Sequence, residues 1–239
     1  EKLAQIQGDR LNNDEAAADA WQQVLELNPS DRRAQENLKK KLLSLKRWDD
    51  IEVLYEESGK WDEFIRLLES QESRETDSNT KVSMLLKVAD LWENKKGKLD
   101  RAARAYEKIL KLDEQHLAAA EALIPIYEEA GNAKGLAESI EVKLHHTTDG
   151  DDCLVLLQQV AELYENKLRK PDVALERYLQ ALTLAPENEQ CAQDVERVAA
   201  ATGQWQRLIE AFLGALEGLA DPVSESMLRI RLGRVLLEE

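Results

Sequence analysis

The sequence of 239 residues has little of what builds turns, cross-links or membrane spans. Five Pro and ten Gly are too few turn formers for a fold rich in β-sheet. The two cysteines, Cys153 and Cys191, have no C-x-x-C spacing, so neither a disulfide framework nor a zinc site is predicted. Uncharged stretches fall far short of the roughly 20 apolar residues that a membrane-spanning helix needs.

Signatures of catalysis are also missing. The sequence contains no glycine-rich phosphate loop, no H-E-x-x-H and no G-x-S-x-G. Only three His are present, so general acid–base chemistry has few candidates. Carboxylates are abundant but recur at surface positions without one distinctive pair. The chain is therefore not expected to be an enzyme, and no cofactor or metal is predicted.

The residues that are abundant favour an acidic, all-α protein. Ala, Leu, Glu, Lys, Arg and Gln dominate, and these are the strong helix formers. There are 47 acidic and 32 basic residues, which gives a formal net charge of −15. This excess disfavours binding to nucleic acid and to anionic lipid. Localisation is left unknown with the cytoplasm favoured, and the start at Glu1 rather than Met leads us to expect a fragment or a processed product.

One segment of the chain is nearly repeated further along the sequence. Residues 87–116 match residues 159–188, at an offset of 72, in 12 of 30 positions without a gap. A third copy lies upstream, where the offset to the next copy is 85 residues. After about residue 45 the offset returns to 72, so the first unit holds a 13-residue insertion. Such a period is typical of a solenoid. We predict one continuous domain, 1–239, with double-hairpin units at about 1–84, 85–156 and 157–226 and a partial unit at 227–239.

The repeated segments resemble a known family. "DEAAADAWQQVLELNPSD" at residues 14–31 and "PDVALERYLQALTLAPEN" at residues 171–188 are similar to the second helix of a tetratricopeptide repeat, with a small Ala, an aromatic residue four positions later and a closing Pro. The turns "NKKGKLD" and "NKLRKPD" are one residue longer than is usual in that family. The resemblance implies a right-handed αα-superhelix of about fourteen helices, whose concave groove is lined by the first helix of each hairpin and holds peptides or partner helices.

The residues expected to point into this groove are mostly acidic. Acids there would attract a basic segment, and the paired Asn would bind backbone amides. The other interpretation is a solvated helix face, because exposed Glu is common on any helix. Some members of the family bind acidic C-terminal peptides in the groove. Such a site is not expected here, since only Asn94 and Asn166 fit the residue pattern of those members. The predicted partner-binding residues are Asp90, Glu93, Asn94, Glu128, Glu129, Glu162, Glu165 and Asn166.

Three functions are left open. The favoured one is a non-catalytic scaffold or adaptor that binds a protein or peptide, and whether that partner is basic is left open. The second is a structural segment of a longer solenoid that self-associates near residues 227–239. The third is a regulatory domain that senses a peptide. Trp48 and Trp61, in the inserted region, are core residues or contact anchors. "HHTTDGDDC" at residues 145–153 is better suited to capping a helix than to binding a metal.

Overall fold

The computed structural model describes residues 1–11, 13–219 and 221–238, and these residues form helices and no strand. Within them the chain has fourteen α-helices, so the predicted all-α class and helix number are confirmed. The chain divides into two compact units, Glu1–Gly97 and Lys98–Glu239. The grouping into three repeat units and a partial fourth stays a prediction, and the last residue of the predicted partial unit, Glu239, lies outside the described residues.

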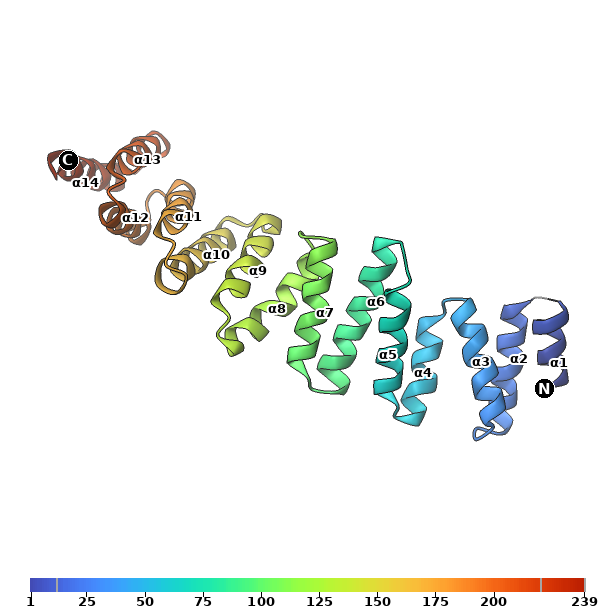
Figure 1. Ribbon diagram of the computed structural model, residues 1–239. Helices are drawn as coiled ribbons and strands as arrows, with labels where there is room; N and C mark the ends of the chain where they lie inside the picture. The colour runs from blue at the N-terminus through green and yellow to red at the C-terminus, as the bar shows by residue number, and fades with distance from the viewer. Residues whose placement is uncertain (12, 220, 239) are drawn as a thin grey trace. The chain divides into compact units, whose positions relative to one another are not determined.

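Unit 1 is a row of short helices in which α2 packs on α3 and α5 packs on α6 (Figure 1). Two of its α-helices continue directly into a π-helical turn. The elements are α1 (Lys2–Gln5), η1 (Ile6–Arg10), α2 (Asp14–Leu27), α3 (Arg32–Ser44), α4 (Trp48–Ser58), α5 (Trp61–Glu72), α6 (Ser78–Asp90) and η2 (Leu91–Lys95).

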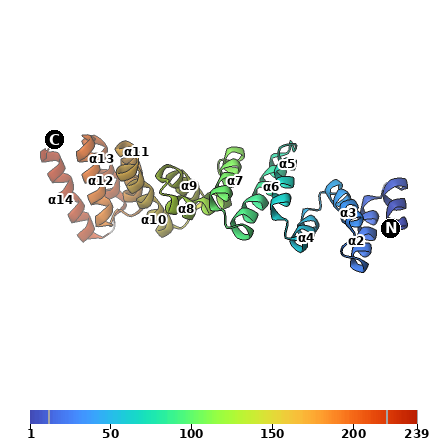
Figure 2. The ribbon, with the colours of Figure 1, turned by 60° about the horizontal axis from the view of Figure 1, so that its bottom comes forward.

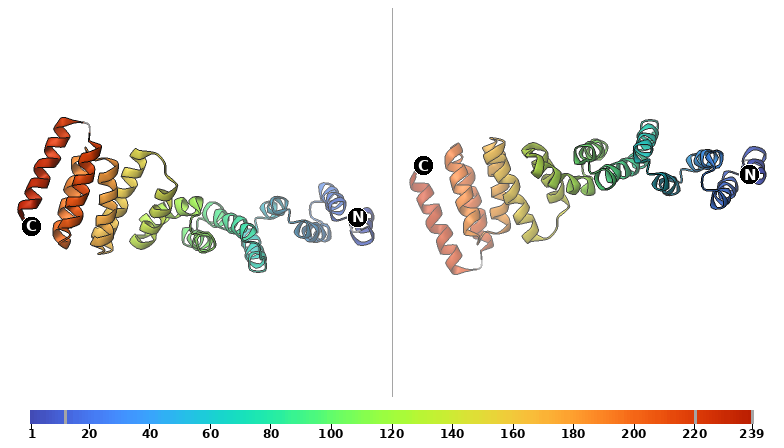
Figure 3. Two further views of the ribbon diagram at one scale, coloured as in Figure 1. Left: turned by 90° about the horizontal axis from the view of Figure 1, so that it is seen from above. Right: turned by 90° about the horizontal axis from the view of Figure 1, so that it is seen from below.

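Unit 2 consists of helices that pack in sequence order, each against the next, and α11–α14 lie side by side (Figures 2 and 3). We call α10, α12 and α14 the first helices of their hairpins, and α11 and α13 the second helices. The elements are α7 (Leu99–Leu112), α8 (Leu117–Ala130), α9 (Ala133–His146), α10 (Gly150–Glu162), η3 (Leu163–Lys167), α11 (Pro171–Leu184), α12 (Glu189–Thr202), α13 (Trp205–Gly218) and α14 (Pro222–Glu238).

The ends of these helices follow from local sequence. The backbone at Gly131 and Gly203 adopts φ of 66° and 68° directly after α8 and α12, a left-handed conformation that Gly tolerates best. Asn188 caps α12 by accepting hydrogen bonds from two backbone N–H groups. α11 begins at Pro171 and ends two residues before Pro186, as expected because Pro suits a first turn and cannot continue a helix.

Small and aromatic residues at repeated positions build the core of the second helices. Ala102 and Tyr106 of α7, and Ala174 and Tyr178 of α11, are all buried, as their spacing predicts. Cys191 occupies the position that Ala holds in the earlier copies and is likewise buried. Burial raises the pKa of the Cys191 thiol, so this side chain serves packing rather than reactivity.

The π-helical turns explain the long inter-helix turns seen in the sequence. η1 starts at Ile6, η2 at Leu91 and η3 at Leu163, and these starts are separated by the same two offsets as the sequence repeat. All three π-turns therefore fall at one repeat position. A π-turn accommodates one extra residue within a helix. The additional residue of "NKKGKLD" and "NKLRKPD" is thus absorbed at the end of the first helix, which changes the direction of the side chains in that turn.

The 13-residue insertion adds one helix to unit 1. When the repeat copies are aligned at an offset of 85 residues, α3 aligns with α8. At an offset of 72 residues, α4 aligns with the same helix. Trp48 is the first residue of α4 and Trp61 is the first residue of α5. The inserted region is thus helical and belongs to the packed row.

Candidate functional site: two polar pockets on the first helices of unit 2

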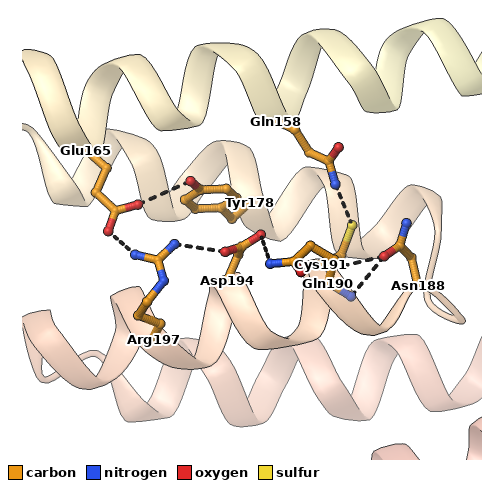
Figure 4. A network of polar contacts seen from close by, with 8 residues as sticks. All are labelled: Gln158, Glu165, Tyr178, Asn188, Gln190, Cys191, Asp194 and Arg197. Carbon is orange, nitrogen blue, oxygen red and sulfur yellow. Dashed lines mark hydrogen bonds and ion pairs between the residues drawn. The ribbon is translucent and has the colours of Figure 1, made fainter.

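A network of charged and hydroxyl groups joins α11, α12 and the π-turn η3 (Figure 4). Glu165 lies in η3, and its Oε2 accepts a hydrogen bond of 3.1 Å from the Tyr178 hydroxyl. The other carboxylate oxygen is paired with Arg197 of α12. Arg197 also pairs with Asp194 one turn earlier, at 2.8 Å. Glu165 is therefore a shared acceptor that connects three consecutive elements.

Burial and neighbouring charges keep Tyr178 and Arg197 of this network protonated. Burial raises the pKa of Tyr178, and the nearby Glu165 charge adds to the effect, so the hydroxyl remains a hydrogen-bond donor. The pKa of Arg197 is raised as well, chiefly by its hydrogen bond to Glu165. The Arg197 guanidinium carbon lies 5.9 Å from the centroid of the Tyr178 ring, within the range of a cation–π contact.

A pocket of about 260 Å³ opens beside this network. Gln190 donates a hydrogen bond of 3.1 Å to Asp194, and Gln158 donates to the Cys191 sulfur at 3.5 Å. Amides present both donors and acceptors, which suits the peptide group. The pocket is smaller than a typical small-molecule site and matches one or two side chains. It is lined by Gln158, Glu162, Asn166, Tyr178, Gln190, Asp194 and Arg197.

A second pocket of about 380 Å³ follows between α12 and α14, with Trp205 of α13 in its wall. Arg197 lines both pockets and so marks their common border. Arg231 of α14 pairs with Glu196 at 3.0 Å and with Glu189 at 3.0 Å. The surface of α10, α12 and α14 that carries these two pockets is called the first-helix face below.

Three predicted residues come together at the first pocket. Glu162 and Asn166 line it, and Glu165 lies beside it in the network. Glu165 differs from the expectation in one respect, because its carboxylate is already engaged by Tyr178 and Arg197. It acts as a support for the pocket wall.

The other predicted residues lie elsewhere. Glu128 and Glu129 are exposed on the last turn of α8, also in unit 2. Asp90, Glu93 and Asn94 belong to unit 1. There the Asn94 amide donates a hydrogen bond of 2.6 Å to Asp90. Their role in binding stays a prediction.

The two tryptophans of the inserted region are half-buried. Trp48 lines a hollow of about 490 Å³ in unit 1, together with Met84 and Lys87. The Lys95 ammonium lies 4.9 Å from the centroid of the Trp61 ring. The intermediate burial is compatible with either core packing or partner contact, so the anchor prediction stays a prediction.

The segment at residues 145–153 caps a helix. Asp149 accepts hydrogen bonds from the backbone N–H groups of Asp151 and Asp152, at 3.0 and 3.1 Å, and so caps α10 as its sequence indicates. His146 makes a 2.7 Å hydrogen bond with the Gln115 carbonyl. In the described part of the chain, no three metal-ligating side chains gather in one place, and no helix has the length and apolarity to cross a membrane.

Sequence reasoning missed Asp194 and Arg197, and it used Tyr178 only as the aromatic residue that marks the repeat. The repeat itself holds a signal for the first two. In the preceding copy, Asp194 corresponds to Ala122 and Arg197 to Pro125. At both positions a charged residue replaces an apolar residue of the preceding copy, and this difference singles the two residues out.

The repeated Ala–aromatic spacing and the paired helices are the features that the chain shares with tetratricopeptide repeats. The two units are built of tetratricopeptide-like helix hairpins. No family model and no curated protein matches the chain. Among solved structures, the chain is similar to MamA, with 16% identity, coverage of 68% of this chain and 91% of the other, and a TM-score of 0.34.

Two further similar structures are tetratricopeptide-repeat (TPR) proteins. The C-terminal part of a TPR repeat-containing protein from Cytophaga hutchinsonii has 15% identity, coverage of 98% of this chain and 94% of the other, and a TM-score of 0.34. The TPR domain of P58(IPK) has 14% identity, coverage of 95% and 76%, and a TM-score of 0.30.

Proposed function

We propose that the chain is a non-catalytic scaffold that binds a segment of another protein across the first-helix face of unit 2. The observation that carries this proposal is the pair of adjoining pockets lined by amide and charged groups and fixed by ion pairs between successive first helices. A surface held in place before binding loses little conformational entropy when a ligand docks. Side-chain amides along the face would bind the ligand backbone.

The acidic residues of the face favour a ligand with at least one basic residue. Glu162 is exposed at the first pocket, and Glu128 and Glu129 are exposed in the same unit. The formal net charge of −15 would speed the approach of a basic segment at low salt. Affinity should therefore fall as ionic strength rises.

Selection of peptides from a random displayed library on the full chain tests the proposal. Peptides that bind should lose affinity by about five- to thirtyfold when Gln158 and Gln190 are both changed to Ala, because one or two hydrogen bonds of about 1 kcal/mol are lost. Gln206→Ala, which removes an exposed amide from the second helix α13, is the matched control. The proposal is wrong if the library yields no binder, or if the pocket and control variants bind alike.

Self-association is a second candidate, favoured by an apolar stripe on α14. Val223, Met227, Ile230 and Leu237 are all exposed and fall on one side of the helix by spacing. Val223 and Leu237 lie at equal sequence distances on either side of Ile230. In an antiparallel pair centred on Ile230, Met227 would therefore oppose the partner's Gly233, whose Cβ position is open. Such self-complementarity suits a two-fold dimer.

Sedimentation equilibrium over a range of concentrations tests this candidate. The chain should form a dimer, and Ile230→Glu should return it to a monomer because the charge would be buried at the centre of the contact. Val155→Glu changes an exposed apolar residue of α10 and is the matched control. A chain that stays monomeric at all concentrations excludes the self-association.

A further inference from the structure

The two pockets of the first-helix face carry opposite formal charge. In the pocket between α10 and α12, Glu162 and Asp194 against Arg197 give a net charge of −1. In the pocket between α12 and α14, Arg197, Arg231 and Arg234 against Glu196 give +2. Charge thus changes sign along the face.

Most of these charges are already neutralised by neighbours. Arg197 is paired with Glu165 and Asp194, and Arg231 is paired with Glu189 and Glu196. The remaining two pocket charges, Glu162 and Arg234, are exposed, and neither has an ion pair within the described residues. These side chains are therefore available to a ligand, and they lie on the outer helices of the face, α10 and α14.

We infer that the ligand of the proposed site is a bipolar peptide segment, with a Lys or Arg at the α10–α12 pocket and an Asp or Glu at the α12–α14 pocket. This inference rests on the proposed function and adds the chemistry of the ligand. α10 and α12 line one pocket, and α12 and α14 line the next. Two helices in contact lie at least about 8–10 Å apart, so the two steps from α10 to α14 span at least about 16–20 Å. An extended chain covers that distance in about five or six residues.

A wholly basic segment fits the face less well. Its cation at the first pocket would meet Glu162, but a second cation about five residues away would meet the exposed guanidinium group of Arg234. Like charges at close range oppose binding, while a carboxylate there gains a partner that presents several N–H donors. The uncharged residues between the two ends would lie along Gln190 and Gln193 of α12.

Synthetic peptides of equal length with blocked ends test this inference by fluorescence anisotropy on the full chain. One peptide carries Lys and Glu about five residues apart, and a second carries them in the reverse order. The other two carry two Lys or two Glu at the same places. One of the mixed-charge peptides should bind about threefold or more tightly than the like-charged ones, from an exposed charge pair worth up to about 1 kcal/mol at each end.

Charge reversal then identifies the residues. Glu162→Lys should shift the preference to the peptide with two Glu, and Arg234→Glu should shift it to the peptide with two Lys. Glu176→Lys on α11 and Arg207→Glu on α13 make the same changes in net charge on the second helices, where both residues are exposed, and should leave the preference unchanged.

The outcomes separate the inference from the function on which it rests. The inference of a bipolar ligand is wrong if all four peptides bind equally. It is also wrong if the control variants on α11 and α13 shift the peptide preference as much as Glu162→Lys and Arg234→Glu do. If library-selected peptides still bind through Gln158 and Gln190 in that case, the scaffold function stands. If neither the library nor the four peptides bind, both are wrong.

Discussion

The hydrogen bond from Tyr178 to Glu165 should stabilise the wall of the first pocket by a measurable amount. Hydrogen bonds to charged groups contribute about 1.5–3 kcal/mol to stability. Arg197 remains as a second partner of Glu165, whose side chain is 19% exposed, so we expect a coupling somewhat below that range, about 1 kcal/mol. That energy corresponds to roughly a fivefold change in the population of locally opened molecules.

A double-mutant cycle measures this coupling. The variants are Tyr178→Phe, Glu165→Gln and the two together, and the readout is hydrogen–deuterium exchange of the α10, α11 and α12 amides. Exchange is the suitable assay because stacked repeats open locally and one global unfolding energy is poorly defined for them. Each single variant should speed exchange, and the double variant should add less than the sum of the two.

Tyr164→Phe is the matched control for this cycle. Tyr164 lies in the same π-turn, and within the described residues it makes no hydrogen bond to Glu165. Combined with Glu165→Gln, it should give additive effects. A coupling between Tyr178 and Glu165 below about 0.3 kcal/mol, the usual scatter of additive sites, would refute the claim that this hydrogen bond holds the pocket wall.

Three further predictions concern residues outside the pockets. Gly135→Ala should destabilise the α8–α9 hairpin by about 1–3 kcal/mol, measured by hydrogen–deuterium exchange of the α8 and α9 amides, because a Cβ there would lie 2.7 Å from the Tyr127 ring. Ser139→Ala should stabilise the same hairpin by about 1 kcal/mol in that assay, since its buried hydroxyl has no partner within the described residues. Hydrogen bonding, chiefly from Lys46, lowers the pKa of Glu75 from 4.5 to about 2. The Glu75 carboxylate should therefore stabilise unit 1 fully above pH 4.5 and progressively less as the pH falls towards 2. The acid titration of Glu75→Gln should lack this loss of stability.

Much of the fold can be predicted from the sequence because each copy has the same pattern of small, aromatic and turn-forming residues. A second helix over about residues 99–112 can be predicted because Ala102, Tyr106 and Leu110 fall on one face, and these are the observed bounds of α7, although Glu114 stands where two other copies have the closing Pro. The long turns are visible in the sequence as one extra residue. Their conformation as π-turns is not, because it depends on how the end of a first helix packs on its neighbours.

The site is only partly visible in the sequence. Glu162 and Asn166 could be predicted because the resemblance implies that their helix face is exposed to a partner. The engagement of Glu165 could not, since it depends on Arg197, which lies far along the chain on another helix. The opposite charge of the second pocket was missed for the same reason: overall composition is acidic, and only folding brings Arg197, Arg231 and Arg234 around one hollow.

The central claim is that the first-helix face of unit 2 binds a protein segment. Its most direct test is hydrogen–deuterium exchange of the full chain with and without the tightest peptide selected from the library. We expect slower exchange in α10 and α12, concentrated around residues 158–166 and 190–197, with α11 and α13 unchanged. Protection confined to α11 and α13, or to unit 1, would contradict it.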